Sequence, residues 1–364
     1  MISEVVDEEN YQGLMKKRNL IVLVSSGCFL IILALFWLFF SPIVKGKSSD
    51  SFPLKICKGS SFYSITNFLL KNNIIPNSFK LKSTARLLNL QSKLKAGKYE
   101  INGGISSYAL LKQLTEGRVA VESVRILEGI TAKQIAGTLK RRIEVDSSRF
   151  MQLVHDPGFV KNLGVEAKTL EGFLFPDTYN FYWGMKSEDI ISIMVNEFKK
   201  NFNDALRKKA EESGFSIVKA LTLASIIEGE AVLDSERSTI SAVYHNRLKR
   251  GVRLQADPTI QYVIEDGPRR LLKRDLEIDS PYNTYKYKGL PPGPINNPGL
   301  ASIRASVYPE NVNYLYFVAN GDGSHTFSRT LKEHLRAKKK FDQYRRKINR
   351  LKAIEREIKK NENR

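Results

Sequence analysis

Residues 216–231 read SIVKALTLASIIEGEA, and this stretch decides the fold. Apolar side chains occur nearly all the way round its helical projection, which is typical of a helix in the core of a domain. The stretch also carries two carboxylates, Glu228 and Glu230, near its carboxyl-terminal end. Loss of hydration and the negative end of the helix dipole both raise a carboxyl pKa there. A raised pKa is what a general acid needs near neutral pH.

The two glutamates cannot line one cleft from a regular helix. At about 100° per residue, two positions separate them by about 160° around the axis. Only one of them is therefore expected to be catalytic. Glu230 is followed by the small Ala231 at the end where the helix can open into a site. Periodicity alone fits equally well with either glutamate capping the helix or pairing with an arginine such as Arg237 or Arg247.

The next motif downstream is RLQADPTIQY at residues 253–262. Pro258 cannot lie in the middle of a helix, because its ring blocks the preceding turn and it has no N–H to donate. We therefore expect Gln255 and Asp257 to lie on a loop.

A second polar loop follows, with the sequence SPYNTYKYKGLPPGPINNPG at residues 280–299. It combines Asn283 and Tyr285 with a stiff turn of proline and glycine. Amides, hydroxyls and aromatic rings on stiff loops suit a carbohydrate groove, because glycine and proline allow close approach without mobile loops. Taken singly, each of these residues is more often part of an ordinary turn.

Residues 314–334 read YLYFVANGDGSHTFSRTLKEH and predict a strand, a hairpin-type turn at Asn320–Gly323, and then His325. His325 is a candidate for orienting a catalytic group or a substrate hydroxyl, although a lone histidine in a turn is more often structural. The four histidines of the chain have no ligand spacing. The sequence therefore predicts no metal site and no cofactor.

Upstream of these motifs, residues 52–118 predict a small α/β module with the order strand, helix, helix, strand, helix. Residues 119–185 predict a linking α/β segment. It begins with a strand, continues with a helix capped by Thr131, and contains a structured loop, LEGFLFPDTYNF, at Leu170–Phe181. The largest part is residues 186–341, which begin with helices around residues 189–200 and 205–213.

The amino-terminal region carries an uncharged run, LIVLVSSGCFLIILALFWLFF, at residues 20–40. Such a run is long enough to cross a bilayer core of roughly 30 Å. We assign residues 20–42 to a transmembrane helix and residues 43–51 to a stalk. Residues 1–19 are expected in the cytoplasm, because Lys16, Lys17 and Arg18 precede the run. The sequence thus predicts a single-pass protein of the cytoplasmic (inner) membrane with an exported body; a cleaved signal peptide is the competing interpretation.

The net charge of the chain is +20, but residues 329–364 hold 15 basic and 5 acidic residues and so half of that excess. The charge is concentrated in the tail, and we do not expect nucleic acid as a partner. Residues 342–364 predict a basic amphipathic helix. Of the two cysteines, Cys28 lies in the apolar run and Cys57 stands alone, which excludes an intrachain disulfide and a cysteine metal site.

Together these motifs resemble the YceG-like endolytic murein transglycosylase family. The resemblance rests on the apolar amino-terminal run and on LEGFLFPDTY, LASIIEGEA, HNRLKRGVRLQADPT, SPYNTYKYKGLPPGPINNPG and YLYFVANGDGSHTFSRTLKEH. It implies an α+β fold with one amino-terminal transmembrane helix, a small LysM-like module at residues 52–118, and a larger mixed α+β catalytic domain at residues 186–341.

The resemblance also implies an activity. The family cleaves peptidoglycan glycan strands internally, between N-acetylmuramic acid and N-acetylglucosamine, and leaves 1,6-anhydromuramyl ends. Its essential glutamate matches Glu230, with Glu228 as the alternate. Residues in matching motifs that are implied to hold the sugars are Gln255, Asp257, Asn283, Tyr285 and His325.

The resemblance further implies that the protein terminates nascent strands and acts together with penicillin-binding synthases.

Two other functions fit the same residues. One is a hydrolase of the same bond, in which Asp257 or another carboxylate activates water. The other is a non-catalytic scaffold that binds the cell wall through the LysM-like module.

Overall fold

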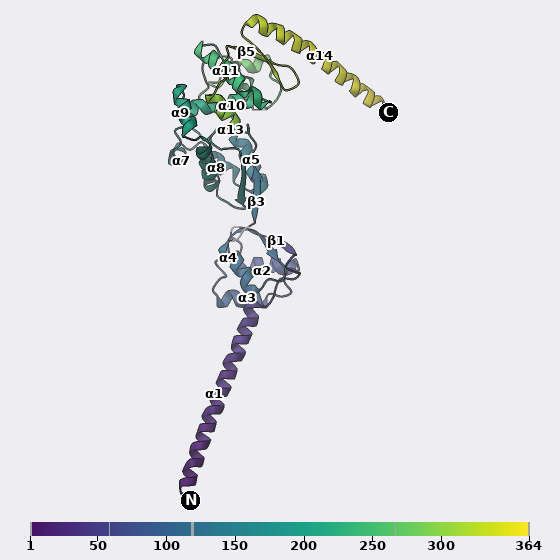
Figure 1. Cartoon of the computed structure of the whole chain (residues 1–364). Coiled ribbons are helices and arrows are strands. Elements are labelled where there is room, and N and C mark those ends of the chain that lie inside the picture. The colour runs from purple at the N-terminus through teal and green to yellow at the C-terminus, as the bar shows by residue number, and fades with distance from the viewer. Residues whose placement is uncertain (1, 58, 118–119, 266, 363–364) are drawn as a thin grey trace. The chain divides into compact units, whose positions relative to one another are not determined.

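The structure is a computed structural model that describes residues 2–57, 59–117, 120–265 and 267–362 (Figure 1). It is a mixed α+β protein whose contacts divide it into two compact units. The first unit holds the residues up to Glu122 together with Tyr182–Gly184. The second holds Ser123–Phe181 together with the residues from Met185 onward.

The chain begins with the long helix α1 (Ile2–Phe40), purple in Figure 1. Among the described residues, Lys17–Phe40 is the one helical segment long and apolar enough to cross a membrane, and its 24 residues are not buried inside the protein. At the end of α1, Lys80 Nζ lies 3.8 Å from the centroid of the Trp37 ring and donates to Ser41 Oγ over 2.6 Å. These contacts attach the end of α1 to the rest of the first unit.

The first unit has the element order that the sequence predicts. Strands β1 and β2 pair antiparallel, with Leu54 opposite Tyr99, and both side chains are buried. Polar residues begin the helices: Ser61 and Ser106 accept hydrogen bonds from backbone N–H groups of α2 and α4. The elements are β1 (Ser51–Ile56), α2 (Phe62–Lys71), α3 (Phe79–Leu87), β2 (Gly97–Asn102) and α4 (Ser107–Glu116).

The second unit begins at Ser123, within β3 (Val121–Arg125), and β3 pairs with β4 (Thr178–Tyr182). The expectation of a loop throughout Leu170–Phe181 was wrong at its end, because Tyr179 and Phe181 alternate with exposed residues and form the buried face of β4. Thr131 caps α5 through a capping box, as predicted. The helices here are α5 (Ala132–Ile143), α6 (Ser147–Val154), α7 (Pro157–Asn162), α8 (Ser187–Asn201) and α9 (Asp204–Glu212).

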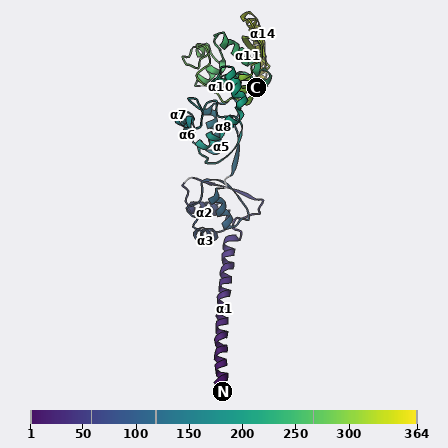
Figure 2. The ribbon, with the colours of Figure 1, turned by 60° about the vertical axis from the view of Figure 1, so that its left-hand side comes forward.

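The predicted buried helix is α10 (Ile217–Glu230), which lies inside the second unit beside α11 (Figure 2). Its residues from Ala220 to Ile227 are all buried. One side of α10 belongs to the apolar cluster around α5 and α8, and the other side belongs to a second cluster with residues of α11 and α12. The neighbouring helices are α11 (Arg237–Lys249), α12 (Asp257–Val263) and α13 (Leu300–Val307).

The remainder of the second unit ends in a hairpin and a long helix. The predicted turn is confirmed, because β5 and β6 pair antiparallel with Ala319 opposite His325. The carboxyl-terminal helix is confirmed too, although it begins earlier than predicted. The elements are the 3₁₀ turns η1 (Asp234–Glu236) and η2 (Lys273–Glu277), then β5 (Tyr316–Ala319), β6 (His325–Ser328) and α14 (Leu331–Glu362).

Two loops far apart in sequence meet at Gly172. Its φ is +87°, and an added methyl group would lie 2.5 Å from Pro294 Cβ, so only glycine fits. Asn297 Oδ1 accepts hydrogen bonds from the N–H groups of Gly172 and Leu174, at 2.9 and 3.0 Å. The LEGFLFPDTY segment is thereby fixed against the segment that carries the second polar loop.

Next to the contact between Gly172 and Pro294 lies a buried carboxyl group, that of Glu171. It accepts hydrogen bonds from the Ala132 N–H at 3.0 Å and from Asn297 Nδ2 at 2.8 Å. Burial raises its pKa to about 7, and these two hydrogen bonds act in the opposite direction. Glu171 thus links the start of α5 to both loops.

We expect the variant Gly172→Ala to lower the free energy of unfolding of the second unit by about 3 kcal/mol. A left-handed backbone costs a non-glycine residue roughly 1–2 kcal/mol, and overpacking against Pro294 adds a similar amount. Chemical denaturation of the full chain, followed by circular dichroism, measures the change.

The matched control is Gly214→Ala. Gly214 also has a positive φ, +71°, but no atom lies within 4 Å of an added methyl group. The control should lose only about 1 kcal/mol. Equal losses in the two variants would contradict the tight contact with Pro294.

Candidate active site

The centre of the candidate site is Glu230, the last residue of α10. The helix stops there because Ala231 takes an extended conformation. Tyr244 of α11 donates its hydroxyl to Glu230 Oε1 over 3.0 Å, and the backbone N–H of Asp257, at the start of α12, donates to the same carboxyl group. Three helices therefore meet at one carboxyl group.

A glycine makes this meeting possible. A methyl group on Gly229 would lie 2.6 Å from Pro258 Cβ and 2.8 Å from Pro258 Cγ. The absence of a side chain at Gly229 lets α12 approach the last turn of α10. That approach brings Asp257 next to Glu230.

The environment of Glu230 raises its pKa to about 7. Loss of hydration is the largest cause, and the negative charge of Asp257 adds to it. The hydrogen bonds from Tyr244 and from the Asp257 backbone, with the positive charge of Arg247, pull in the opposite direction. The residue as a whole keeps some exposure to solvent. A carboxyl group of this kind can both give and take a proton near neutral pH.

Asp257 lies in the first turn of α12 and not on a loop, so that expectation was wrong. Pro258 is tolerated there because a helix leaves the first N–H groups without intrahelical partners. Asp257 Oδ1 accepts a hydrogen bond from the Tyr285 hydroxyl over 2.5 Å. Burial, this hydrogen bond and the Asp257 charge all raise the pKa of Tyr285, which therefore stays protonated and acts as a donor.

Gln255 lies beside Arg247, whose positive charge acts on Glu230. Its backbone has a positive φ of +51°, and its N–H donates to the Thr284 carbonyl over 3.1 Å. Gln255 Oε1 lies 3.5 Å from Arg247 Nη1. The Arg247 side chain is buried and donates to the carbonyls of Leu315 and Leu254 at 2.7 Å each. Its positive charge lowers the pKa of Glu230.

Asn283 is completely buried and does not face the site. Its Nδ2 donates to the carbonyls of Leu276 and Ile278 at 2.9 and 2.7 Å. Its Oδ1 accepts from the N–H of Tyr285 over 2.9 Å. The amide group thus shapes the loop and positions Tyr285, and in this structure it is occupied by backbone partners.

His325 is not in contact with Glu230 either. Its Nδ1 lies 2.7 Å from Glu236 Oε2, and its backbone N–H donates to Glu236 Oε1 over 2.9 Å. The ring meets Phe317 edge-on at 5.3 Å, and Phe317 meets Tyr244 edge-on at 5.9 Å between centroids. Phe317 and Tyr244 therefore connect His325 to Glu230 by one chain of contacts.

Glu228, the alternate candidate, has a different set of partners. Its Oε1 pairs with Arg237 Nη1 at 3.2 Å, and both side chains are more than nine-tenths buried. Its Oε2 accepts from the N–H of Gly299 over 3.0 Å. Arg237 also binds Asp234 at 2.8 Å and Ser302. The pairing with Arg237 that periodicity allowed is confirmed for Glu228, which joins α10 to α11 and α13.

Two residues of the site were missed as site residues in the sequence. Tyr244 and Arg247 lie three positions apart on one face of α11, the spacing that places two side chains on the same surface. That spacing was the signal available in the sequence, but it does not show that this face of α11 contacts Glu230.

Among the described residues, no group of three or more histidine, cysteine, aspartate or glutamate side chains could hold a metal ion.

Comparison with known proteins gives consistent relatives. The model of the YceG-like family matches residues 54–340. An endolytic murein transglycosylase of Bacillus subtilis is 34% identical over 314 residues, which cover 82% of this chain and 87% of that protein. One of Streptococcus pneumoniae is 29% identical over 296 residues, and the match spans 73% of this chain but only 53% of the relative.

A solved structure agrees with the sequence relatives. The crystal structure of a YceG-like protein from Listeria monocytogenes is 35% identical, has a TM-score of 0.55, and covers 79% of this chain and 99% of its own. Since the family model matches well over half of the sequence, and since the Bacillus relative passes 30% identity across most of both proteins, the chain belongs to the YceG-like family.

Proposed function

We propose that this protein is an endolytic lytic transglycosylase of peptidoglycan. It cleaves the bond between N-acetylmuramic acid and N-acetylglucosamine within a glycan strand and leaves a 1,6-anhydromuramyl end. The observation that carries the proposal is Glu230, a carboxyl group with a pKa raised to about 7 at the meeting point of three helices. The names of the Bacillus and Streptococcus relatives support the same reaction.

One carboxyl group is enough for this chemistry. Protonated Glu230 donates its proton to the glycosidic oxygen as the bond from that oxygen to the muramic acid C1 breaks. The ionised carboxylate then takes the proton of the muramic acid C6 hydroxyl, whose oxygen forms the new bond to C1. No water is consumed, and Glu230 ends the cycle protonated.

The surrounding residues have distinct proposed roles. Tyr244 orients Glu230 through its hydroxyl, and Asp257 favours the protonated form of Glu230 through its charge. Gln255, Asp257 and Tyr285 contact the sugars. Asn283 contributes by positioning Tyr285, and His325 contributes through the hairpin that it ties to Glu236.

A hydrolase of the same bond is the second candidate, because Asp257 lies beside Glu230 and is the carboxylate that would activate water. Mass spectrometry of the ends made from purified glycan strands separates the two reactions. Anhydro ends are lighter than reducing ends by one water. Anhydro ends support the transglycosylase, reducing ends support the hydrolase, and intact strands support the wall-binding scaffold.

Location and organisation are part of the proposal. The apolar segment of α1, with Lys16, Lys17 and Arg18 before it, supports an anchor in the cytoplasmic membrane with the body outside. The strand, helix, helix, strand core of residues 52–118 supports a LysM-like module, followed by a linking segment at 119–185 and a catalytic domain at 186–341. In that setting the enzyme terminates nascent strands beside penicillin-binding synthases.

The first test of the site is Glu230→Gln. We expect strand cleavage to fall by about 10²- to 10⁴-fold, because the amide can neither donate the proton nor take it back. The fold should persist, since an amide oxygen still accepts from Tyr244. The measurement is the rate of release of new strand ends by the full chain in detergent.

The matched variant is Glu228→Gln, which removes the neighbouring charge without touching the proposed acid. Breaking the buried pair with Arg237 should cost about 3–5 kcal/mol of stability, seen as a lower melting temperature. Folded protein should still cut strands. If Glu228→Gln abolished cleavage at a temperature where it stays folded, and Glu230→Gln did not, the assignment would be reversed.

The pH dependence of kcat/KM is a second test. The free enzyme must hold Glu230 protonated, so activity should be flat below about pH 7 with respect to this group and should fall about tenfold per unit above it. Asp257→Asn removes a charge that raises the Glu230 pKa and should move the fall to lower pH. Tyr244→Phe removes a hydrogen bond that lowers the pKa and should move the fall to higher pH.

The two shifts have opposite signs, which a general loss of activity cannot reproduce. Wild-type and variant profiles are measured on the same glycan strands. Shifts in the same direction, or none, would exclude Glu230 as the group that titrates.

A further inference from the structure

The carboxyl-terminal helix α14 (Leu331–Glu362) is anchored to the second unit by its first half. The His334 ring stacks on Tyr316 of β5 at 5.3 Å between centroids. Further along, Tyr344 lies over Gly321, where an added methyl group would come within 2.7 Å of the Tyr344 ring. The hairpin β5–β6 therefore holds α14 as far as Tyr344, and the helix continues for 18 more residues.

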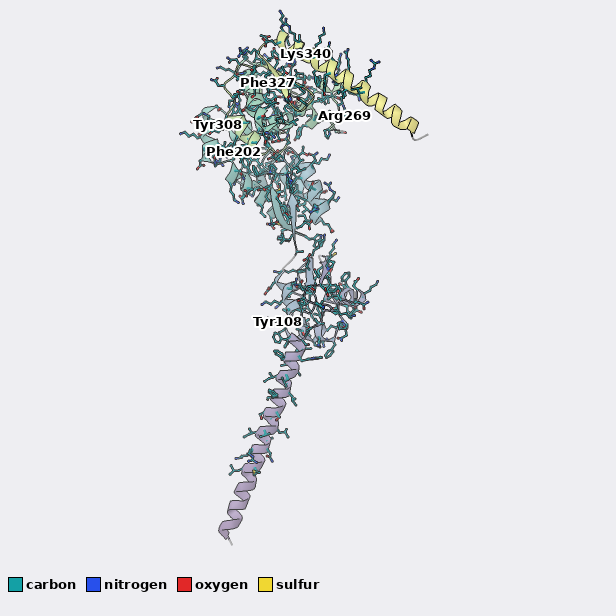
Figure 3. All side chains as sticks on the ribbon, turned by 45° about the vertical axis from the view of Figure 1, so that its right-hand side comes forward. Tyr108, Phe202, Arg269, Tyr308, Phe327 and Lys340 are labelled. Carbon is teal, nitrogen blue, oxygen red and sulfur yellow. The ribbon has the colours of Figure 1, made fainter. Side chains whose placement is uncertain are left out.

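The carboxyl-terminal segment that contains this helix carries a large share of the charge of the protein. Residues 329–364 contain 15 basic and 5 acidic residues, so +10 of the net +20 lies here. Basic side chains that the structure describes stand out from the helix, as Lys340 does in Figure 3. Lys339, Lys340, Arg346 and Arg350 are all exposed. The region offers a dense positive surface to a partner.

An apolar stripe runs along the same helix. Phe341, Tyr344, Ile348 and Leu351 follow one another at intervals of three and four residues, which places them on one face. Tyr344 and Leu351 are each 48% exposed and Phe341 and Ile348 are half-buried, so the body of the protein covers the stripe only in part. At about 100° per residue, Lys340 and Arg345 border the stripe on its two sides.

We propose that α14 lies on the surface of an anionic membrane. Its apolar stripe enters the boundary between headgroups and acyl chains, and its basic residues pair with the lipid phosphates. A helix with a narrow apolar face and a lysine- and arginine-rich polar face binds membranes in this way, and anionic lipid strengthens the binding.

Two other occupants fit less of this surface. A second copy of α14 could cover the stripe, but the flanking Lys340 and Arg345 would then face like charges across the contact. A soluble polyanion could pair with the basic residues, but it would leave Tyr344 and Leu351 in water. An anionic membrane accounts for both the charge and the stripe.

The test uses the full chain reconstituted into lipid vesicles. Cys28 and Cys57, both exposed, are replaced by serine, and Leu351→Cys receives an environment-sensitive dye. We expect a blue shift of the dye in vesicles with about 30% phosphatidylglycerol and none in pure phosphatidylcholine. The same dye on Ile193→Cys, a site in α8 that is 39% exposed, is the control for non-specific effects of the vesicle and should not shift.

Charge is tested by removing four basic residues from α14, in the variant Lys339→Gln, Lys340→Gln, Arg346→Gln and Arg350→Gln. The matched control removes four exposed lysines elsewhere in the second unit, in the variant Lys133→Gln, Lys161→Gln, Lys168→Gln and Lys208→Gln. The α14 variant should lose the blue shift, and the control should keep it. Raising NaCl from about 0.05 M to about 0.5 M should weaken the shift in the parent protein, because salt screens exposed charges.

The alternatives give different results, and each contradicts the proposal. An equal shift in neutral and anionic vesicles that grows with protein density would indicate pairing between copies of α14. No shift in anionic vesicles, with quenching on addition of soluble polyphosphate, would indicate a polyanion as the partner. No response to either partner would leave α14 as a solvent-exposed helix and overturn the proposal.

Discussion

Burial of α10 between two apolar clusters is the constraint on which the site depends. The helix contributes Leu221 and Ala224 to one cluster and Leu223, Ile226 and Ile227 to the other, so it packs into both cores at once. A helix held on both sides has one permitted rotation. That rotation fixes where the two carboxylates of its last turn point, and it separates the proton-handling Glu230 from the ion-paired Glu228.

The two carboxylates show how partners determine what one residue type does. Glu228 pairs with a buried guanidinium group and accepts a hydrogen bond from a backbone N–H. Glu230 lies beside a carboxylate and meets little water, and both conditions raise its pKa, while the hydrogen bond from the Tyr244 hydroxyl acts in the opposite direction. The difference arises from a turn of roughly 160° on one helix. Gly229, between them, contributes by having no side chain where Pro258 packs.

Local signals made much of this fold predictable. The apolar periodicity of α10, the cap at Thr131 and the turn before His325 depend on residues close together in sequence, and the structure has all three. The errors at β4 and at Asp257 were also local: an alternating pattern was overlooked, and a proline was taken as a break rather than a start. The contacts of Asn283 and of His325 could not be predicted, because their partners are set by how loops and strands pack.

The buried Glu171 gives the second unit an energetic dependence on acidity. Its pKa in the folded state, about 7, lies above the ordinary glutamate value of 4.5 that applies once the chain unfolds. The stabilising contribution of the neutral carboxyl is therefore complete below about pH 4.5 and is lost as the pH rises through about 7, a difference of about 3 kcal/mol. Between these limits folding takes up protons at Glu171 and at Glu230 alike. These two groups therefore stabilise the folded unit more in mildly acidic surroundings than at a pH where both are ionised.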